Sequence, residues 1–102
     1  MTTELKARIY YGSAENGFAA DYTEFVSTEL ARRCFKDMVE ESLPSGWDIN
    51  EDVDIDYAYD NFGGMQAELP KNNRGFREVF ILSQEGQYEQ TEGVFERLQK
   101  SL

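Results

Sequence analysis

The clearest pattern of apolar and polar positions along the chain is helical and begins at about residue 28. The apolar residues recur at spacings of one, four and five, which places them on one helix face: Leu30, Ala31, Cys34, Phe35, Met38 and Val39. Mostly charged residues take the other face. Ser27 or Thr28 can cap the first turn, and Pro44 and Gly46 end the pattern. This segment is therefore predicted to form an amphipathic helix.

A second helical pattern occupies the C-terminal part of the chain, from about Gln87. The residues at helical spacing are Tyr88, Thr91, Val94, Phe95, Leu98 and Leu102. Gly93 lies among them and lowers the stability of the helix by about 1 kcal/mol relative to alanine. The alternative is that Glu85-Gly86 forms a hairpin turn.

Two β-rich segments near the N-terminus, 6–11 and 18–25, predict strands. The residues between them include Asn16-Gly17, a strong hairpin signal because both residues tolerate positive φ. We therefore expect a β-hairpin here.

Strict alternation of apolar and polar residues marks the segment 53–60. Val53, Ile55, Tyr57 and Tyr59 are expected to point one way, and Asp54, Asp56, Ala58 and Asp60 the other. The alternation predicts a half-buried strand whose outer face is lined with carboxylates.

Two further strands are expected after a turn at 61–64. The first is short, 65–69, and Pro70 ends it. The second, 76–83, contains the continuous apolar run 79–82, which suits a central strand covered on both faces.

The predicted order of elements is thus β-β-α-β-β-β-α, and the predicted class is α+β. We expect an antiparallel sheet of four to five strands with two helices, both on one face of the sheet, which is the simplest arrangement. A chain of 102 residues is long enough for one domain, 1–102, and too short for two of ordinary size.

Side chains for catalysis and metal binding are scarce. The chain has no histidine, the usual general base and the commonest metal ligand. Cys34 is the single cysteine and is expected to be a buried small hydrophobe, so neither thiol catalysis nor an ordinary zinc site is expected. No pair of carboxylates stands out for acid–base chemistry. We therefore predict that the chain is not an enzyme and has no catalytic residue, cofactor or metal.

One motif begins like a calcium-binding EF-hand loop, with Asp48, Asn50 and Asp52 at its opening spacing. The sixth position needs glycine and holds Val53, and the twelfth needs glutamate and holds Tyr59. A calcium loop is therefore not expected, and weak binding of a divalent cation is left as an alternative.

The compartment is suggested by three absences. A single cysteine gives no disulfide framework, which favours a reducing environment. The segment 1–6 has no apolar core of a signal peptide, and no apolar run approaches the ~18 residues that span a bilayer. We expect a cytoplasmic protein with no membrane partner.

Charge is distributed unevenly along the chain. The 34 residues between Lys36 and Lys71 contain no lysine or arginine. They carry ten carboxylates, here called the acidic block: Asp37, Glu40, Glu41, Asp48, Glu51, Asp52, Asp54, Asp56, Asp60 and Glu68. The other 68 residues carry ten acidic and ten basic side chains, so the whole net charge of −10 comes from the block.

Such a block is either a solvated surface that maintains solubility or a binding surface. Its carboxylates repel one another and aspartate is a poor strand former, so the block opposes folding. If it binds, the expected partner is a basic protein surface and not nucleic acid itself, because phosphate binding needs clustered lysine and arginine.

Carboxylates on a rigid strand and helix end can imitate nucleic-acid phosphates and occupy the basic groove of a nuclease, restriction enzyme, repressor or CRISPR effector. Small acidic inhibitors from phages and other mobile elements act in this way, including anti-CRISPR and antirestriction proteins, and the chain is similar to them in physical type. The residues expected to contact the partner are Asp48, Glu51, Asp52, Asp54, Asp56 and Asp60, with Trp47 and Phe62 as aromatic anchors. Glu89 and Glu92 lie outside the block and are expected to face solvent.

Two other functions are left open by the sequence. One is a structural or assembly subunit that forms a homodimer through an apolar sheet face or edge. The other is a module that binds a small ligand or a metal.

Overall fold

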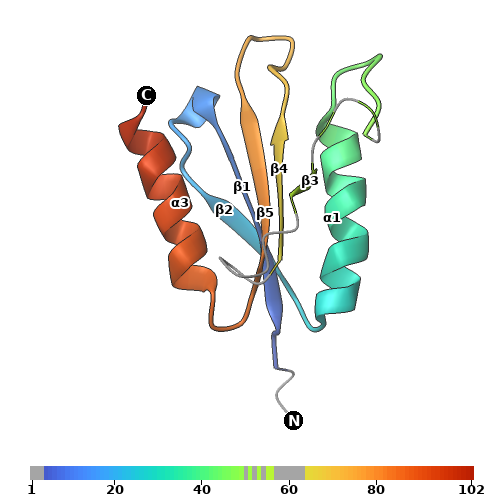
Figure 1. Cartoon of the computed structure of the whole chain (residues 1–102), viewed down its shortest axis with the longest axis vertical. Coiled ribbons are helices and arrows are strands. Elements are labelled where there is room, and N and C mark those ends of the chain that lie inside the picture. The colour runs from blue at the N-terminus through green and yellow to red at the C-terminus, as the bar shows by residue number, and fades with distance from the viewer. Residues whose placement is uncertain (1–3, 50, 52, 54, 57–63) are drawn as a thin grey trace.

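The computed structural model of the protein describes residues 4–49, 51, 53, 55–56 and 64–102. Its strands form one antiparallel sheet in the order β2-β1-β5-β4-β3 (Figure 1). The strands are β1 (Ala7–Ser13), β2 (Asp21–Phe25), β3 (Ile55–Asp56), β4 (Met65–Leu69) and β5 (Glu78–Gln84). The helices are α1 (Thr28–Ser42), α3 (Tyr88–Lys100) and the short 3-10 helix η1 (Ala14–Asn16). The predicted α+β class is confirmed, and the predicted order of elements agrees with the structure.

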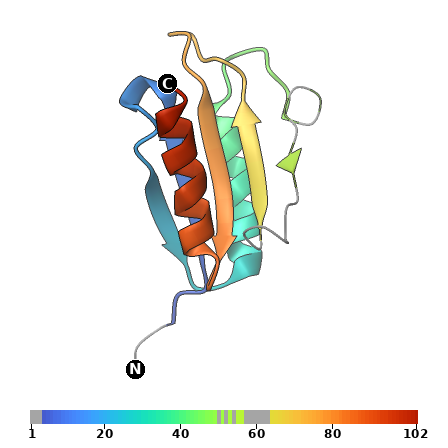
Figure 2. The same cartoon turned by 60° about the vertical axis from the view of Figure 1, so that its left-hand side comes forward.

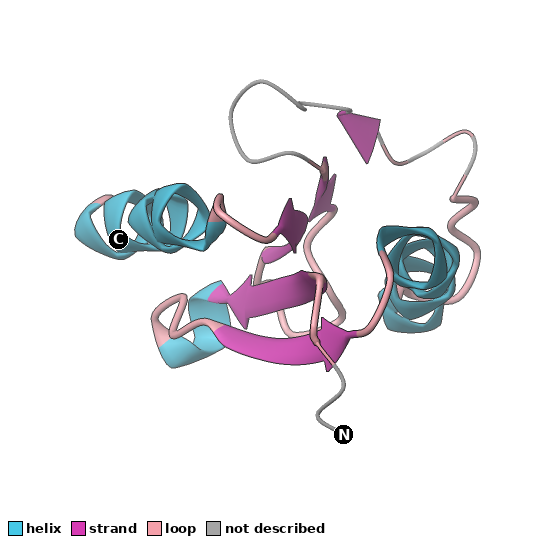
Figure 3. Ribbon diagram, turned by 90° about the horizontal axis from the view of Figure 1, so that it is seen from below, coloured by secondary structure: helices cyan, strands magenta, loops and turns pink. Residues whose placement is uncertain are grey.

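The two helices cover opposite faces of the sheet, so the prediction that both lie on one face is wrong (Figure 3). The reason lies in β5. Its residues Phe80 and Leu82 belong to the core beneath α1, whereas Val79 and Ile81 belong to the core beneath α3. Because a strand alternates its side chains between faces, a continuous apolar run needs cover on both sides.

Helix α1 forms where the sequence predicts it. The Ser27 hydroxyl caps it by accepting a hydrogen bond from the Leu30 backbone N–H at 3.1 Å. Ala31, Phe35 and Val39 are buried at intervals of four residues, and Cys34 is only partly buried. Leu30 is 41% exposed, contrary to the prediction. Each residue turns the helix by about 100°, so Leu30 lies at the margin of the stripe that Ala31, Phe35 and Val39 define.

The N-terminal hairpin is confirmed, but its connection is longer than a two-residue turn. Strand β1 leads into η1, and the positive φ angles fall at Gly17 (71°) and Phe18 (58°). Strand β2 therefore begins at Asp21 and not at Phe18. The physical reason is burial, because Phe18 leaves the strand direction to pack in the core beneath α3, where it is 2% exposed.

Only part of the predicted strand 53–60 can be described. Ile55 and Asp56 form β3 and pair with Ala67 and Gln66 of β4. Val53 is buried in the core beneath α1, and Ile55 packs against that core, as the alternation predicts. Asp54 and the segment 57–60 lie outside the described residues.

Helix α3 follows directly after β5, so the alternative hairpin turn at Glu85-Gly86 is wrong. Figure 2 shows α3 lying along one face of the sheet. The helix buries Thr91 and Phe95, and the Thr91 hydroxyl donates a hydrogen bond to the buried Ser83 hydroxyl at 2.8 Å. Leu102 was expected on the apolar face of this helix, but it lies beyond the last helical residue and is 67% exposed.

The core beneath α1 can be tested at Phe35. Because Phe35 is fully buried, Phe35→Ala should lower the free energy of unfolding by about 3–5 kcal/mol, measured by urea denaturation. Lys36 is the matched control because it is exposed on the same helix, and Lys36→Ala should change that energy by less than about 0.5 kcal/mol. Equal effects of the two substitutions would contradict the assigned face of α1.

Candidate interaction surface

The structure describes only some of the predicted partner-binding residues. Trp47, Asp48 and Glu51 are described and exposed, with Trp47 at 45%. For Asp56 only the backbone is described, paired with Gln66. The remaining predicted positions lie outside the described residues: Asp52, Asp54, Asp60 and Phe62.

The segment after α1 holds its exposed residues in two turns. The Trp47 backbone N–H donates to the Pro44 carbonyl at 3.2 Å, and the Glu51 N–H donates to the Asp48 carbonyl at 3.3 Å. Ile49, inside the second turn, packs against the core beneath α1. The segment therefore attaches to the core at Ile49 and presents Trp47, Asp48 and Glu51 to solvent.

The C-terminal half of α1 carries three further carboxylates of the acidic block. Asp37, Glu40 and Glu41 are exposed there, and the last turn of the helix contains no basic residue. The C-terminus of a helix bears a partial negative charge, so the two carboxylates in the last turn, Glu40 and Glu41, are placed unfavourably.

Helix α3 has the opposite arrangement. Glu89 lies in its first turn, and Arg97 and Lys100 lie in its last turn. Each of these charges opposes the nearby end of the helix dipole and is therefore stabilising. The contrast shows that acidic residues without a basic one occupy the C-terminal end of α1 but not that of α3.

Close ion pairs link charged residues that lie outside the acidic block. They join Lys6 to Glu4 and Glu85, Arg8 to Glu24 and Glu92, and Arg74 to Glu15. Among the described parts of the chain, five members of the block make no such pair: Asp37, Glu40, Glu41, Glu51 and Glu68. No cation of the described residues therefore lies within ion-pair distance of these five carboxylates.

The described members of the block do not all share one side of the sheet. Met65, Ala67 and Leu69 of β4 are buried in the core beneath α1. Glu68 alternates with them and is exposed on the other side of the sheet, where α3 lies. The carboxylates of α1 and Glu68 are consequently separated by the sheet.

A hollow of about 320 Å³ opens where the C-terminal end of α1 meets the sheet. Its lining includes two carboxylates, two hydroxyls and an aromatic pair: Glu41, Glu78, Thr23, Ser42, Tyr11 and Phe80. Sequence reasoning missed Tyr11 and Glu78 as surface residues of interest. They belong to strands β1 and β5, and no sequence spacing relates them to Glu41.

A second polar cluster lies on the α3 side and corrects one expectation. Glu92 was expected to face solvent only, but the Tyr10 hydroxyl donates a hydrogen bond to its Oε2 at 2.7 Å, and Arg8 lies 3.7 Å from the same atom. The Arg8 guanidinium lies 4.2 Å from the ring centroids of both Tyr22 and Tyr88.

These contacts indicate a structural role for the cluster. Arg8 also donates a hydrogen bond to the Tyr10 hydroxyl at 2.9 Å. Burial raises the pKa of Tyr10 to about 12, so the hydroxyl stays protonated and can donate to Glu92 at neutral pH. Glu92 consequently fastens α3 to the sheet.

Metal-binding and membrane-spanning features were sought in the described ranges. No group of three or more His, Cys, Asp or Glu side chains there is placed to hold a metal ion. Of the helices in those ranges, none is long and apolar enough to cross a bilayer.

The unfavourable charge order of α1 can be tested with one neutral substitution. Glu40→Gln removes a negative charge from the C-terminal end of α1 and should raise the free energy of unfolding by about 0.3–1 kcal/mol, measured by urea denaturation at low salt. Glu89→Gln removes the same charge from the first turn of α3 and should lower that energy by a similar amount. A loss of stability on Glu40→Gln would show that this carboxylate has a favourable role in the fold.

Comparisons of the chain with protein-family models, with curated proteins and with solved structures found no match.

Proposed function

We propose that the protein binds a basic protein surface through its acidic block. The supporting observation is the group of exposed carboxylates at the C-terminal end of α1 and in the segment that follows. Glu40 and Glu41 oppose the helix dipole, and together with Asp37 and Glu51 they have no ion-pair partner among the described residues. We account for carboxylates that oppose folding in this way by the affinity for a partner that they would contribute.

The partner is proposed to be a nucleic-acid-handling protein. Such proteins have grooves lined with lysine and arginine that neutralise phosphates. Carboxylates held on a helix end and in the segment that follows it offer negative charges to the same groove. Electrostatic attraction over this surface would raise the association rate, and the bound protein would exclude the nucleic acid.

In this proposal the protein is a non-catalytic inhibitor of the kind that viruses and mobile elements use. The target is a nuclease, a restriction enzyme, a CRISPR effector or a repressor. Trp47 supports the proposal as an aromatic anchor, because it is 45% exposed beside Asp48 in the same segment. The protein itself is not proposed to bind nucleic acid.

A homodimeric assembly subunit is the second candidate, and strand β2 is the observation that favours it. Within the described part of the chain, strand β2 pairs with β1 alone at the end of the sheet, and its Tyr22 is 45% exposed. An open edge can pair with a second copy of the chain. Asp21 and Glu24 on the same strand act against such pairing, as charges on edge strands generally do. Analytical ultracentrifugation distinguishes the two candidates, because a dimer at micromolar concentration favours the second.

The proposed binding can be tested by charge reversal after the partner has been captured from the source cells with the wild-type protein. Glu40→Lys combined with Glu51→Lys should lower the association rate constant by about tenfold at low salt, measured by surface plasmon resonance. The difference from wild type should shrink as salt rises, because screening reduces long-range attraction. A nucleic-acid duplex should compete with the wild-type protein for the partner.

The matched control is Glu89→Lys combined with Glu96→Lys on α3. It changes the net charge equally, uses exposed positions outside the block and spares Glu92. The control should leave the association rate within about twofold of wild type. Equal losses for the two variants would mean that bulk charge and not the acidic block governs binding. Binding that the duplex does not affect would contradict nucleic-acid mimicry.

A further inference from the structure

The hollow at the C-terminal end of α1 has the shape of a small binding site. Its volume of about 320 Å³ lies at the lower end of the range for ligand pockets. Strands β1, β2 and β5 and helix α1 all contribute to its lining. The hollow is therefore a surface depression that the fold forms by bringing four elements together.

An aromatic pair forms part of the lining. The rings of Tyr11 and Phe80 are stacked, with centroids 6.0 Å apart and planes inclined by 26°. Phe80 is 6% exposed and belongs to the core beneath α1, whereas Tyr11 is 38% exposed. The stack fixes the Tyr11 ring against the sheet and leaves part of it open. An open ring held in place is suited to receive a cation on its face.

Two carboxylates from different elements complete the charged part of the lining. Glu41 comes from the last turn of α1, and Glu78 is the first residue of β5. Thr23 and Ser42 add hydroxyl groups, and no lysine or arginine lines the hollow. The hollow therefore presents negative charge and hydrogen-bond acceptors beside an aromatic ring.

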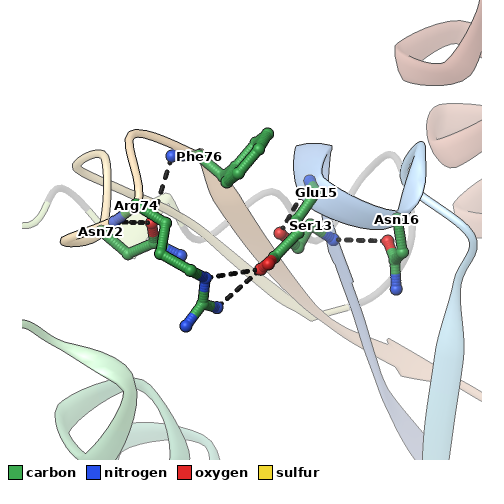
Figure 4. A network of polar contacts seen from close by, with 6 residues as sticks. All are labelled: Ser13, Glu15, Asn16, Asn72, Arg74 and Phe76. Atoms are coloured by element: carbon green, nitrogen blue, oxygen red, sulfur yellow. Dashed lines mark hydrogen bonds and ion pairs between the residues drawn. The ribbon is translucent and has the colours of Figure 1, made fainter.

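The negative charge of Glu78 is only weakly offset. Burial raises the pKa of the Glu78 carboxyl above its ordinary value, Arg74 partly opposes the rise, and Glu15 adds to it. Arg74 is bound to another carboxylate, because its Nε and Nη2 donate to Glu15 Oε2 at 3.0 and 2.6 Å (Figure 4). A cation that enters the hollow would supply the positive partner charge that the Glu78 carboxylate lacks.

From these features we propose that the hollow is the anchoring site for an arginine side chain of the partner, an inference that rests on the proposed function. A guanidinium is planar, stacks on aromatic rings and donates several hydrogen bonds in fixed directions. It can therefore lie against the Tyr11 ring while it donates to Glu41 and Glu78. A lysine ammonium has the charge but lacks the plane, and citrulline has the shape but lacks the charge.

The test uses three short peptides that differ at one residue. Acetyl-Gly-Arg-Gly-amide, its lysine analogue and its citrulline analogue are titrated into the protein, and binding is followed by NMR chemical shifts. The arginine peptide should shift the Tyr11 ring and the Glu41 and Glu78 side chains and should bind more tightly than the lysine peptide. The citrulline peptide should give no saturable shift. Equal binding of all three peptides, or arginine-dependent shifts elsewhere on the protein, would overturn the proposal.

Neutral variants locate the contact. Glu78→Gln should weaken binding of the arginine peptide by about tenfold, since a charge-assisted hydrogen bond becomes a neutral one. Tyr11→Leu removes the ring but keeps an apolar side chain, and it should weaken binding by about threefold. Glu96→Gln is the matched control, because it removes the same charge from an exposed position on α3 that lies outside the acidic block and does not line the hollow. The backbone spectrum of each variant reports whether it is folded, and unchanged binding on Glu78→Gln would overturn the proposal.

The same variants separate this proposal from the broader function. If Glu40→Lys with Glu51→Lys weakens the captured complex but Glu78→Gln and Tyr11→Leu do not, the acidic block binds the partner and the arginine site is wrong. If the arginine peptide binds the hollow but the block reversal leaves the complex unchanged, the site stands and the proposed function of the block is wrong.

Discussion

Strand β5 is the element on which the arrangement of the structure depends, because Val79, Phe80, Ile81 and Leu82 are all apolar and all buried. Each such side chain contributes about 1.5–3 kcal/mol when it is removed from water. Alternation divides the four between two cores, so each face of the sheet requires its own helix. Strands β1 and β4 pair with β5 on either side, and β1 contributes to both cores whereas β4 contributes to the core beneath α1.

The two faces have different electrostatic characters. On the α3 side, Arg8 joins β1 to Glu24 of β2 and Glu92 of α3, and α3 itself follows the order of charges that its dipole favours. On the α1 side, carboxylates gather at the helix end where they are unfavourable. The burial of the core beneath α1 must therefore offset the unfavourable energy of these carboxylates, because the fold would be more stable without their charge. That imbalance is the physical basis for the proposal that the acidic block binds a partner.

Much of the fold could be predicted from the sequence because its patterns are local. The periodicity of α1, the short strand before Pro70 and the two-sided apolar run of β5 each depend on neighbouring residues. The placement of α3 on the opposite face could not be read in this way, because an amphipathic helix does not reveal which face of a sheet it covers. Phe18 lies outside the strand predicted for it, and Leu30 lies outside the buried stripe of α1, for a similar reason. Tertiary packing decides which apolar residues are buried.

The negative charge of the candidate site could be predicted from the sequence, but the shape of the hollow could not. The uneven distribution of charge is visible in the sequence, and the exposure of Asp48 and Glu51 agrees with it. The hollow was not predictable, because Tyr11 and Glu78 come from strands far from Glu41 in the sequence. Glu92 was misjudged because its partner, Tyr10, lies 82 residues away.

The central claim is that repulsion within the acidic block opposes folding, and the salt dependence of stability tests it most directly. The Debye length falls from about 30 Å at 0.01 M to about 8 Å at 0.15 M ionic strength. The free energy of unfolding in urea at neutral pH should therefore rise as sodium chloride is added over this range. Glu40→Gln with Glu51→Gln should reduce that rise more than Glu89→Gln with Glu96→Gln does. A flat or falling response of the wild-type protein would contradict the account, because it would mean that favourable ion pairs already compensate the block.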